Sequence, residues 1–308
     1  MARTQHRHFT TLSLTTPAGF DFWRTVRSHG WCALPPFSHD ESSKTLSRVL
    51  TLTDETTVAC TASGDGHAVR LKVESGRPLS KEQRNEVKNQ MARCLRLDED
   101  FGPFHDEVRK LPRFMWITES GSGRMLRSPT VFEDVVKMLC TTNCTWALTT
   151  VMVTNLVRLL GREFADGQRA FPSPGAIADI SEKFLRKEVK AGYRAPYLLE
   201  LAQRVARGEL DLEAWRGSAL TTEELFEEMR KVKGIGPYAA GNIMKLIGRY
   251  DYLGLDSWVR ARYYELHKKG RRVKDSTIEK DYKKYGKWRG LVFWLEMTRK
   301  WHDDELPF

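Results

Sequence analysis

The chain of 308 residues contains only five cysteines, an odd number, and no hydrophobic run long enough to cross a membrane. It also contains no internal repeat and no low-complexity segment. The first sixteen residues are polar and basic, which is not the pattern of a secretory signal. We therefore expect an intracellular protein with free thiols. Cys140 and Cys144 lie one helical turn apart, but without a second Cys/His pair nearby they are more typical of buried small hydrophobes than of metal ligands.

The composition indicates a soluble globular protein, with 41% hydrophobic and 29% charged residues, and the length suggests two domains. Lys and Arg number 50 against 40 Asp and Glu, which gives a formal charge of +10. Such an excess favours a polyanionic partner, nucleic acid first among them. Many basic proteins bind no polyanion, so charge alone leaves this open.

The pattern along the chain changes from strands to helices. Residues 20–73 hold short β-branched runs separated by Ser, Asp and Gly, which predicts an antiparallel sheet. Beyond Pro78 a charged amphipathic run predicts a helix up to Leu97, and from Ser128 onward the spacing is helical. We predict an α+β protein: an N-terminal β-sheet domain with flanking helices over residues 1–124, followed by an all-α domain over residues 125–308.

Residues 221–260 hold the most informative motif, two helices joined by a glycine turn. Thr221 and Glu224 fit a capping box that opens the first helix, which we expect to end at Lys233. Residues 234–236 form the turn, and Pro237 suits the first position of a second helix, which we expect to reach Gly248.

Backbone N–H groups of Gly234, Ile235 and Gly236 at the start of the second helix would suit a phosphate oxygen. Such contacts would bind the DNA backbone without regard to the base sequence. An ordinary turn has the same glycine pattern, so the turn alone does not decide between the two.

Asp256 follows the second helix after a short apolar connection and directly precedes another helix. With the hairpin, the pattern VKGIGPYAA followed by LGLDSWV resembles the helix-hairpin-helix (HhH-GPD) DNA glycosylases. By that resemblance Asp256 is the catalytic carboxylate, which would stabilise the positive charge that develops on the sugar as the glycosidic bond breaks. Without the hairpin, a plain helix N-cap would be the preferred interpretation of this residue.

Tyr238 stands where members of this superfamily that also nick the strand carry a Schiff-base lysine. We therefore expect hydrolysis without an efficient lyase step. Within the superfamily, the similarity is to the 8-oxoguanine and 3-methyladenine glycosylase branch, whose members place a β-rich domain before the helices.

Two further segments resemble the DNA-contacting loops of that branch. Asn143 matches the asparagine that fills the gap left by the flipped nucleotide, and Tyr193 and Arg194 match an inserted aromatic wedge and an arginine aimed at the estranged base. The alternatives are a helix-cap asparagine and a packing tyrosine.

The base pocket is where the sequence departs from the 8-oxoguanine enzymes. Those enzymes have a glutamine where this chain has Phe293 and an aromatic residue where it has Met297. The resemblance implies a pocket containing Tyr238, Trp258, Phe293 and Met297. An aromatic pocket from Trp258, Phe293 and Trp294 would suit an electron-poor alkylated purine. Core packing is an equal alternative for Trp258 and the preferred one for Phe293 and Trp294. A second departure is Gly30, which here precedes Trp and Cys instead of the usual glutamine and aromatic residue.

We expect no required cofactor. The iron–sulfur cluster of some relatives is excluded because the last cysteine is Cys144. The resemblance allows one K⁺ or Na⁺ on the backbone carbonyls of Arg230, Val232 and Ile235. Residues 268–289 contain ten Lys or Arg and three acids, which fits either a solvated face or contact with the DNA backbone.

Together these features predict a monomeric, monofunctional base-excision-repair glycosylase that acts on double-stranded DNA containing a damaged purine, without a membrane partner. The predicted damage is an alkylated purine such as 3-methyladenine or 7-methylguanine. The expected location is intracellular: the cytoplasm or nucleoid of a bacterium, or the nucleus of a eukaryote. An 8-oxoguanine glycosylase is the alternative enzyme, and a non-catalytic helix-hairpin-helix DNA-binding module is the alternative of a different class.

Overall fold

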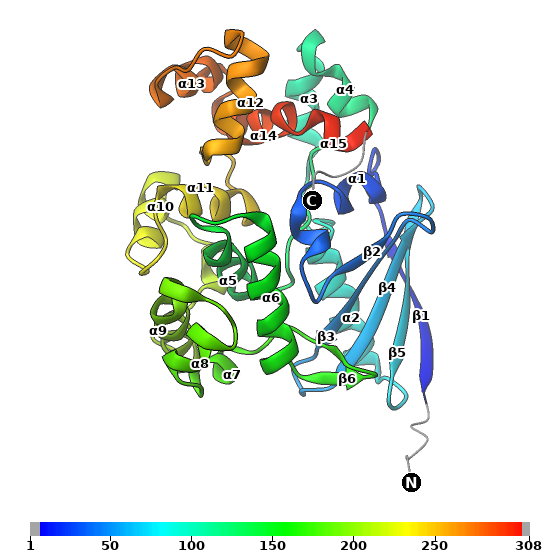
Figure 1. Ribbon diagram of the computed structural model, residues 1–308. Coiled ribbons are helices and arrows are strands. Elements are labelled where there is room, and N and C mark those ends of the chain that lie inside the picture. Colours follow the sequence, from blue (N-terminus) through cyan, green and yellow to red (C-terminus); the bar gives the residue numbers. More distant parts are fainter. Residues whose placement is uncertain (1–6, 304–308) are drawn as a thin grey trace.

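The computed structural model describes residues 7–303, and within them an antiparallel sheet of five strands carries the N-terminal part of the molecule (Figure 1). The strands run in the spatial order β1-β5-β4-β3-β2. Their bounds are His8–Thr15, Ser38–Asp40, Thr45–Thr51, Thr57–Gly64 and Ala68–Ser75. Every second residue of β4 and β5 is buried, as expected where one face of a sheet is covered. The predicted sheet is confirmed, but its first strand, β1, lies before residue 20, where no strand was expected.

Helix α2 (Lys81–Cys94) covers the inner face of this sheet with Val87, Met91 and Cys94. Ser80 caps it in a capping box with Gln83. The helix predicted beyond Pro78 is therefore confirmed. Two short elements, α1 (Phe22–Val26) and a 3-10 turn (Gly30–Ala33), follow β1 and lie between the sheet and the remaining helices (Figure 1).

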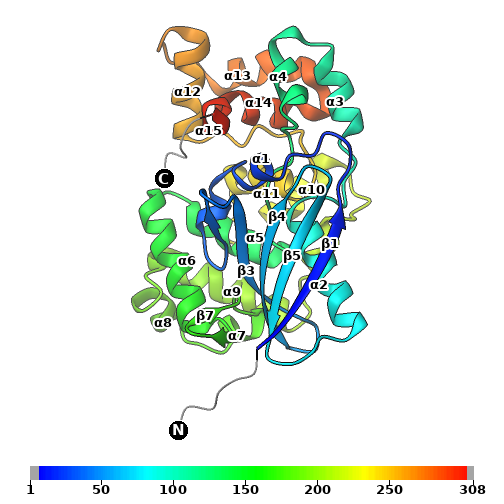
Figure 2. The same cartoon turned by 90° about the vertical axis from the view of Figure 1, so that its right-hand side faces the viewer.

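The middle of the chain forms a layer of helices beside the sheet (Figures 1 and 2). A small hairpin, β6 (Glu163–Ala165) and β7 (Gln168–Arg169), interrupts this layer. Its helices are α5 (Val131–Thr141), α6 (Trp146–Leu160), α7 (Pro174–Ala178), α8 (Glu182–Lys187), α9 (Ala195–Ala206), α10 (Thr222–Arg230) and α11 (Pro237–Leu246).

A third group of helices combines two segments that are far apart in the sequence. Helices α3 (Gly102–Arg109) and α4 (Met115–Glu119) lie beside the C-terminal helices (Figure 1). Phe104 and Phe114 share one hydrophobic cluster with Tyr263 and Phe293. The C-terminal helices are α12 (Ser257–Lys268), α13 (Asp275–Tyr282), α14 (Arg289–Met297) and α15 (Arg299–Asp303). Residues 101–117 thus precede the predicted domain boundary in sequence but pack with the C-terminal helices.

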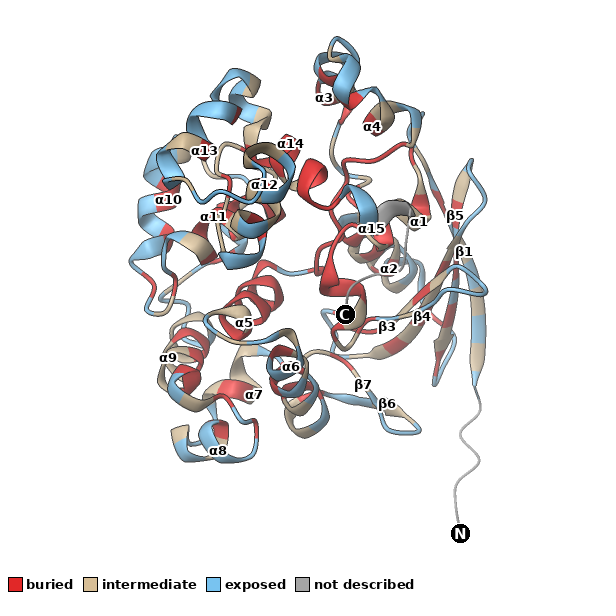
Figure 3. Cartoon of the chain, turned by 45° about the horizontal axis from the view of Figure 1, so that its top comes forward, coloured by how far each residue is buried: buried red, intermediate tan, exposed pale blue. Residues whose placement is uncertain are grey.

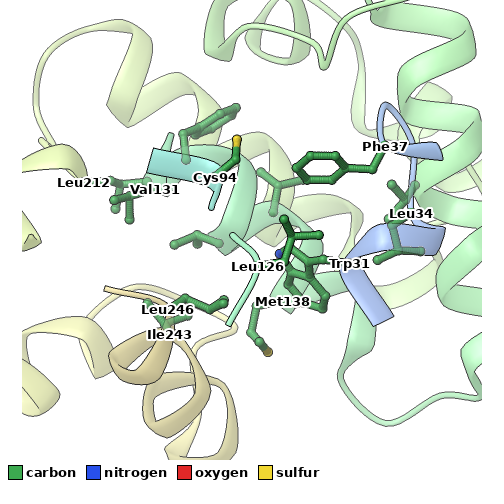
Figure 4. Packing of buried hydrophobic residues seen from close by; sticks show 14 of the residues in the cluster. Trp31, Leu34, Phe37, Cys94, Leu126, Val131, Met138, Leu212, Ile243 and Leu246 are labelled. Atoms are coloured by element: carbon green, nitrogen blue, oxygen red, sulfur yellow. The ribbon is translucent and has the colours of Figure 1, made fainter. Parts of the chain in front are cut away.

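A second, larger cluster unites the sheet with the middle helices, as the close packing of Trp31, Met138 and Leu246 shows (Figure 4). The connection over residues 121–129 is buried throughout and passes between the layers (Figure 3). Arg96 is also fully buried and donates to the carbonyls of Lys245 and Leu246, 2.6 and 2.7 Å away. Such charge-assisted bonds hold the end of α11 against the N-terminal part. Within residues 7–303 no helix combines the length and apolar character that a membrane span requires.

Candidate active site

The predicted helical hairpin is present as α10, a glycine turn and α11. Thr221 and Glu224 form the expected capping box, and Pro237 is the first residue of α11. Gly234 has a φ of +88°, and a Cβ there would lie 3.0 Å from the side chains of Leu139 and Tyr197. Glycine is therefore required both by the backbone and by close packing. Helix α10 ends at Arg230, earlier than predicted, because a turn closed by Ile235 N–H and the Val232 carbonyl at 3.0 Å follows it.

Asp256 is the N-cap of α12. Its Oδ1 accepts a hydrogen bond from the backbone N–H of Val259 at 2.8 Å. Its Oδ2 has no hydrogen-bond partner among the residues that the structure describes. The N-cap interpretation is thus correct, but it uses one oxygen only. The cap holds the carboxylate in a fixed orientation and leaves the other oxygen available.

Two hollows meet at Asp256. One is a cavity of about 370 Å³ between the sheet part and the helices, and the other is a groove of about 820 Å³ along the hairpin. Thr141, Cys144, Tyr238 and Ser257 also belong to both. The carboxylate therefore lies where the groove opens into the cavity.

The cavity wall is mainly aromatic. Ring centroids lie 4.8 Å apart for Trp258 and Trp301, and 5.7 Å apart for Trp301 and Trp294. The ring of His29 contacts both Trp294 and Trp31, with centroid distances of 6.4 and 4.9 Å. Five of the nine tryptophans line the cavity: Trp31, Trp146, Trp258, Trp294 and Trp301. Because aromatic faces attract cations, this wall suits an electron-poor ring better than an electron-rich one.

Two of the four residues predicted for the base pocket are on this wall and two are not. Tyr238 and Trp258 line the cavity, and Trp258 is 39% exposed. Phe293 and Met297 do not line it, because both are buried in the cluster between α14 and the other C-terminal helices. Successive residues of a helix point about 100° apart, so α14 presents Trp294 to the cavity and Phe293 to the core. The prediction that Phe293 and Met297 form the pocket is corrected accordingly.

The groove brings together residues predicted to contact DNA. Asn143, which has a φ of +46°, donates from Nδ2 to the Tyr193 hydroxyl at 3.4 Å. That hydroxyl in turn donates to the Thr142 carbonyl at 3.2 Å. Tyr193 is 47% exposed and lies on the groove with Gly234 and Gly236.

Arg194 is placed differently from the prediction. It is only 4% exposed, donates to the carbonyl of Thr142, and packs against the Tyr193 ring. The 3-10 turn Gly192–Arg194 directs Tyr193 outward and Arg194 inward. In this structure Arg194 supports Tyr193 and does not reach into the groove.

The amines of the hairpin lie away from the cavity lining. Lys233 is paired with Glu200 at 2.7 Å, and Lys245 is fully buried with its Nζ donating to the Leu253 carbonyl at 2.7 Å. Burial lowers the pKa of Lys245 to about 7, while the charge of Asp256 acts in the opposite direction. Burial and the Asp256 charge raise the pKa of Tyr238 to about 12, so its phenol stays protonated.

Sequence reasoning missed His29, Trp146 and Trp301 as parts of the cavity. A Cβ on Gly30 would lie 2.3 Å from Cη2 of Trp146, so this glycine allows the indole to lie against the backbone. The only available signals were the high tryptophan content and the unusual Gly-Trp pair at residues 30 and 31. No group of three or more His, Cys, Asp or Glu side chains suited to a metal occurs among the described residues.

Comparisons with known proteins agree with this architecture. No protein-family model matches the sequence. Bacillus subtilis YfjP, which bears the name of a DNA-3-methyladenine glycosylase, is 25% identical over 138 residues, which cover 43% of this chain and 47% of that protein. The match thus spans about half the length of this relative.

Solved structures match over nearly the whole chain. The 3-methyladenine DNA glycosylase from Archaeoglobus fulgidus has a TM-score of 0.73 at 19% identity, covering 94% of this chain and 98% of that one. The 8-oxoguanine glycosylase/lyase from Clostridium acetobutylicum has a TM-score of 0.72 at 22% identity, covering 95% and 97%. MBOgg1, solved with a low-affinity DNA ligand, has a TM-score of 0.73 at 20% identity, covering 96% and 99%.

The chain therefore has the fold of the helix-hairpin-helix DNA glycosylases, which confirms the resemblance seen in its sequence. More particularly, it has the arrangement of the 8-oxoguanine and 3-methyladenine branch, with an N-terminal sheet before the helices.

Proposed function

We propose that this protein is a DNA glycosylase of base excision repair that hydrolyses the N-glycosidic bond of a flipped, damaged purine. The observation that carries the proposal is the position of Asp256 where the groove meets the cavity. Duplex DNA in the groove and one extruded base in the cavity would place the sugar beside the free carboxylate oxygen. A fixed anion at that point stabilises the positive charge that develops on the sugar.

Alkylated purines are the proposed substrates. The tryptophan-rich wall favours a ring that carries positive charge, as 3-methyladenine and 7-methylguanine nucleosides do. Phe293 lies in the core and contributes nothing to this wall. The name of the Bacillus subtilis relative also supports this substrate class.

The reaction we propose is hydrolysis without an efficient lyase step. A lyase needs a reactive amine beside the sugar, and Tyr238 stands on the cavity wall where the strand-nicking relatives have lysine. Lys245 is enclosed by protein and is not part of the cavity lining. Strand nicking without added alkali would contradict this part of the proposal.

A monovalent cation at the hairpin remains a proposal as well. The carbonyl oxygens of Arg230, Val232 and Ile235 are hard ligands of the kind that K⁺ and Na⁺ take. The Val232 carbonyl already accepts one hydrogen bond from Ile235 but keeps a second lone pair, so the turn fits such a role. Such an ion would fix the turn, in which Gly234 and Gly236 would offer N–H groups to a phosphate, whereas the Ile235 N–H predicted for this role is already bonded to the Val232 carbonyl. A higher melting temperature in K⁺ than in an equal concentration of a bulky organic cation would support it.

The experiment that tests the proposed function is a panel of duplexes, each with one lesion. Release of 3-methyladenine or 7-methylguanine is the expected result. Release of 8-oxoguanine alone would favour the alternative enzyme. Tight, salt-dependent binding with no release from any duplex would mean that the chain is a non-catalytic DNA-binding module.

A further inference from the structure

His29 is a buried residue of the cavity wall, only 5% exposed. Its ring centroid lies 4.9 Å from that of Trp31 and 6.4 Å from that of Trp294. The N–H groups of both indoles are already used within the protein. Trp31 donates to Asp134 at 2.8 Å, and Trp294 donates to the Ser28 carbonyl at 3.1 Å. The two rings beside His29 therefore offer the cavity no free N–H.

The contacts of His29 fix which of its nitrogens carries the proton. Nε2 is hydrogen-bonded to the carbonyl oxygen of Leu126. A carbonyl can only accept, so Nε2 must be the donor. Burial lowers the pKa of His29 to about 3, and the nearby charges of Arg96, Lys137 and Lys245 act in the same direction. The ring is therefore neutral near pH 7, and its Nδ1 carries a lone pair.

The protein neither uses nor fully encloses that lone pair. Nδ1 has no hydrogen-bond partner among residues 7–303, and it does not belong to the polar atoms that the protein encloses without a partner. Because His29 lines the cavity, an occupant can reach this nitrogen. The wall thus combines aromatic surface with a neutral acceptor whose direction is fixed from behind by Leu126.

Resting on the glycosylase function proposed above, we propose that His29 determines base specificity, its Nδ1 accepting a hydrogen bond from the exocyclic amino group of the flipped purine. A positive charge on an alkylated ring polarises its amino N–H bonds and strengthens such a bond. A neutral imidazole also does not repel that charge. A base with an oxo group at the same point would place an oxygen lone pair against the lone pair of Nδ1, and this repulsion would weaken its binding.

The test compares bases that differ only in the amino group. The full chain and its His29→Phe variant are titrated with 3-methyladenine and with 3-methylpurine, which lacks the amino group, and then with 7-methylguanine and 7-methylhypoxanthine. Quenching of the cavity tryptophans reports binding. We expect the wild type to prefer the amino-bearing base of at least one pair by roughly 5- to 10-fold, the scale of one hydrogen bond between neutral groups, because the free bases carry no fixed charge. In His29→Phe that preference should disappear, with both bases of the pair bound alike.

Equal binding within both pairs by the wild type would overturn the inference, and so would a preference that survives in His29→Phe. Lesion release from the duplex panel is measured in parallel. If lesions are released from the duplexes but the two bases of each pair are bound alike, the glycosylase proposal stands and the role of His29 is refuted. If the amino-bearing base is preferred but no lesion is released from any duplex, the role of His29 in binding the base is supported and the glycosylase proposal is refuted.

A measurement on the wild-type protein covers the case in which His29→Phe does not fold. In ¹⁵N-histidine NMR spectra we expect His29 to have an unprotonated Nδ1 whose signal shifts when the amino-bearing base is added. A protonated Nδ1, or a signal that the base does not move, would contradict the inference.

Discussion

The ammonium group of Lys245 donates to the carbonyl of Leu253, three residues before Asp256, at a distance of 2.7 Å. Lys245 is fully buried on α11, and Leu253 belongs to the segment that leads into α12. This bond joins the second helix of the hairpin to the segment that carries the carboxylate. The position of Asp256 therefore depends on a residue that lies outside the cavity lining.

Replacing Lys245 by Met should change the pH dependence of stability. Burial lowers the folded-state pKa of Lys245 to about 7 from an ordinary 10.5, so between these values the unfolded chain binds more protons than the folded one. The wild type should therefore gain stability relative to Lys245→Met as the pH rises from about 7 toward 10, by up to a few kcal/mol. Urea unfolding of both proteins at several pH values measures this. Parallel profiles would mean that Lys245 has no such shift.

Replacing Gly30 by Ala should displace Trp146 from the cavity wall. The new Cβ would lie 2.3 Å from the indole, and only a movement of Trp146 or of the backbone could relieve this clash. We expect a loss of about 1–3 kcal/mol in stability and a clear loss of base release. Gly76→Ala is the matched control, because nothing lies within 4 Å of a Cβ at that residue. Equal base release by the two variants would refute the role given to Trp146.

Replacing Tyr193 by Ala should slow base release without destabilising the fold. Its ring is exposed beside Asn143, where it can enter the duplex and replace lost stacking. Because opening a base pair costs a few kcal/mol, we expect single-turnover release to fall about 10-fold or more. Phe9→Ala removes an even more exposed ring, 60% against 47%, from strand β1 and should leave release unchanged. Release by Tyr193→Ala at the wild-type rate would show that the ring is not a wedge.

The basic run at residues 268–289 is tested by neutralising Arg271 and Arg272, which are both exposed. If they contact phosphates, the double variant to Ala should bind duplex DNA more weakly. The slope of log affinity against log salt should also decrease by about 2. Lys81→Ala, an exposed charge on α2, serves as the control. An unchanged slope would assign residues 271 and 272 to a solvated face.

Much of the architecture was predictable from local patterns in the sequence. The capping box at Thr221 and the Pro237 helix start depend only on neighbouring residues, and both are confirmed. Strand β1 was missed because its alternating residues HFTTLSLT are short and mostly polar. The arrangement of α3 and α4 beside the C-terminal helices depends on contacts far apart in sequence, which local patterns do not reveal.

The candidate site was only partly predictable, for a similar reason. Asp256 and Tyr238 follow from the hairpin motif, and the structure places both on the cavity wall. Phe293 was assigned to the pocket because it stands where the 8-oxoguanine enzymes have a glutamine, but the rotation of α14 directs Trp294 there instead. His29 carries no local signal, since its role depends on the Leu126 carbonyl, almost a hundred residues away in the sequence.

The central claim is that Asp256 acts through its charge, and Asp256→Asn tests it most directly. Asparagine can still cap α12 through its side-chain oxygen, so fold and DNA binding should be kept while the negative charge is lost. Single-turnover release of an alkylated purine from duplex DNA should fall by a factor on the order of 10² to 10⁴. Release within about twofold of the wild-type rate would contradict the account.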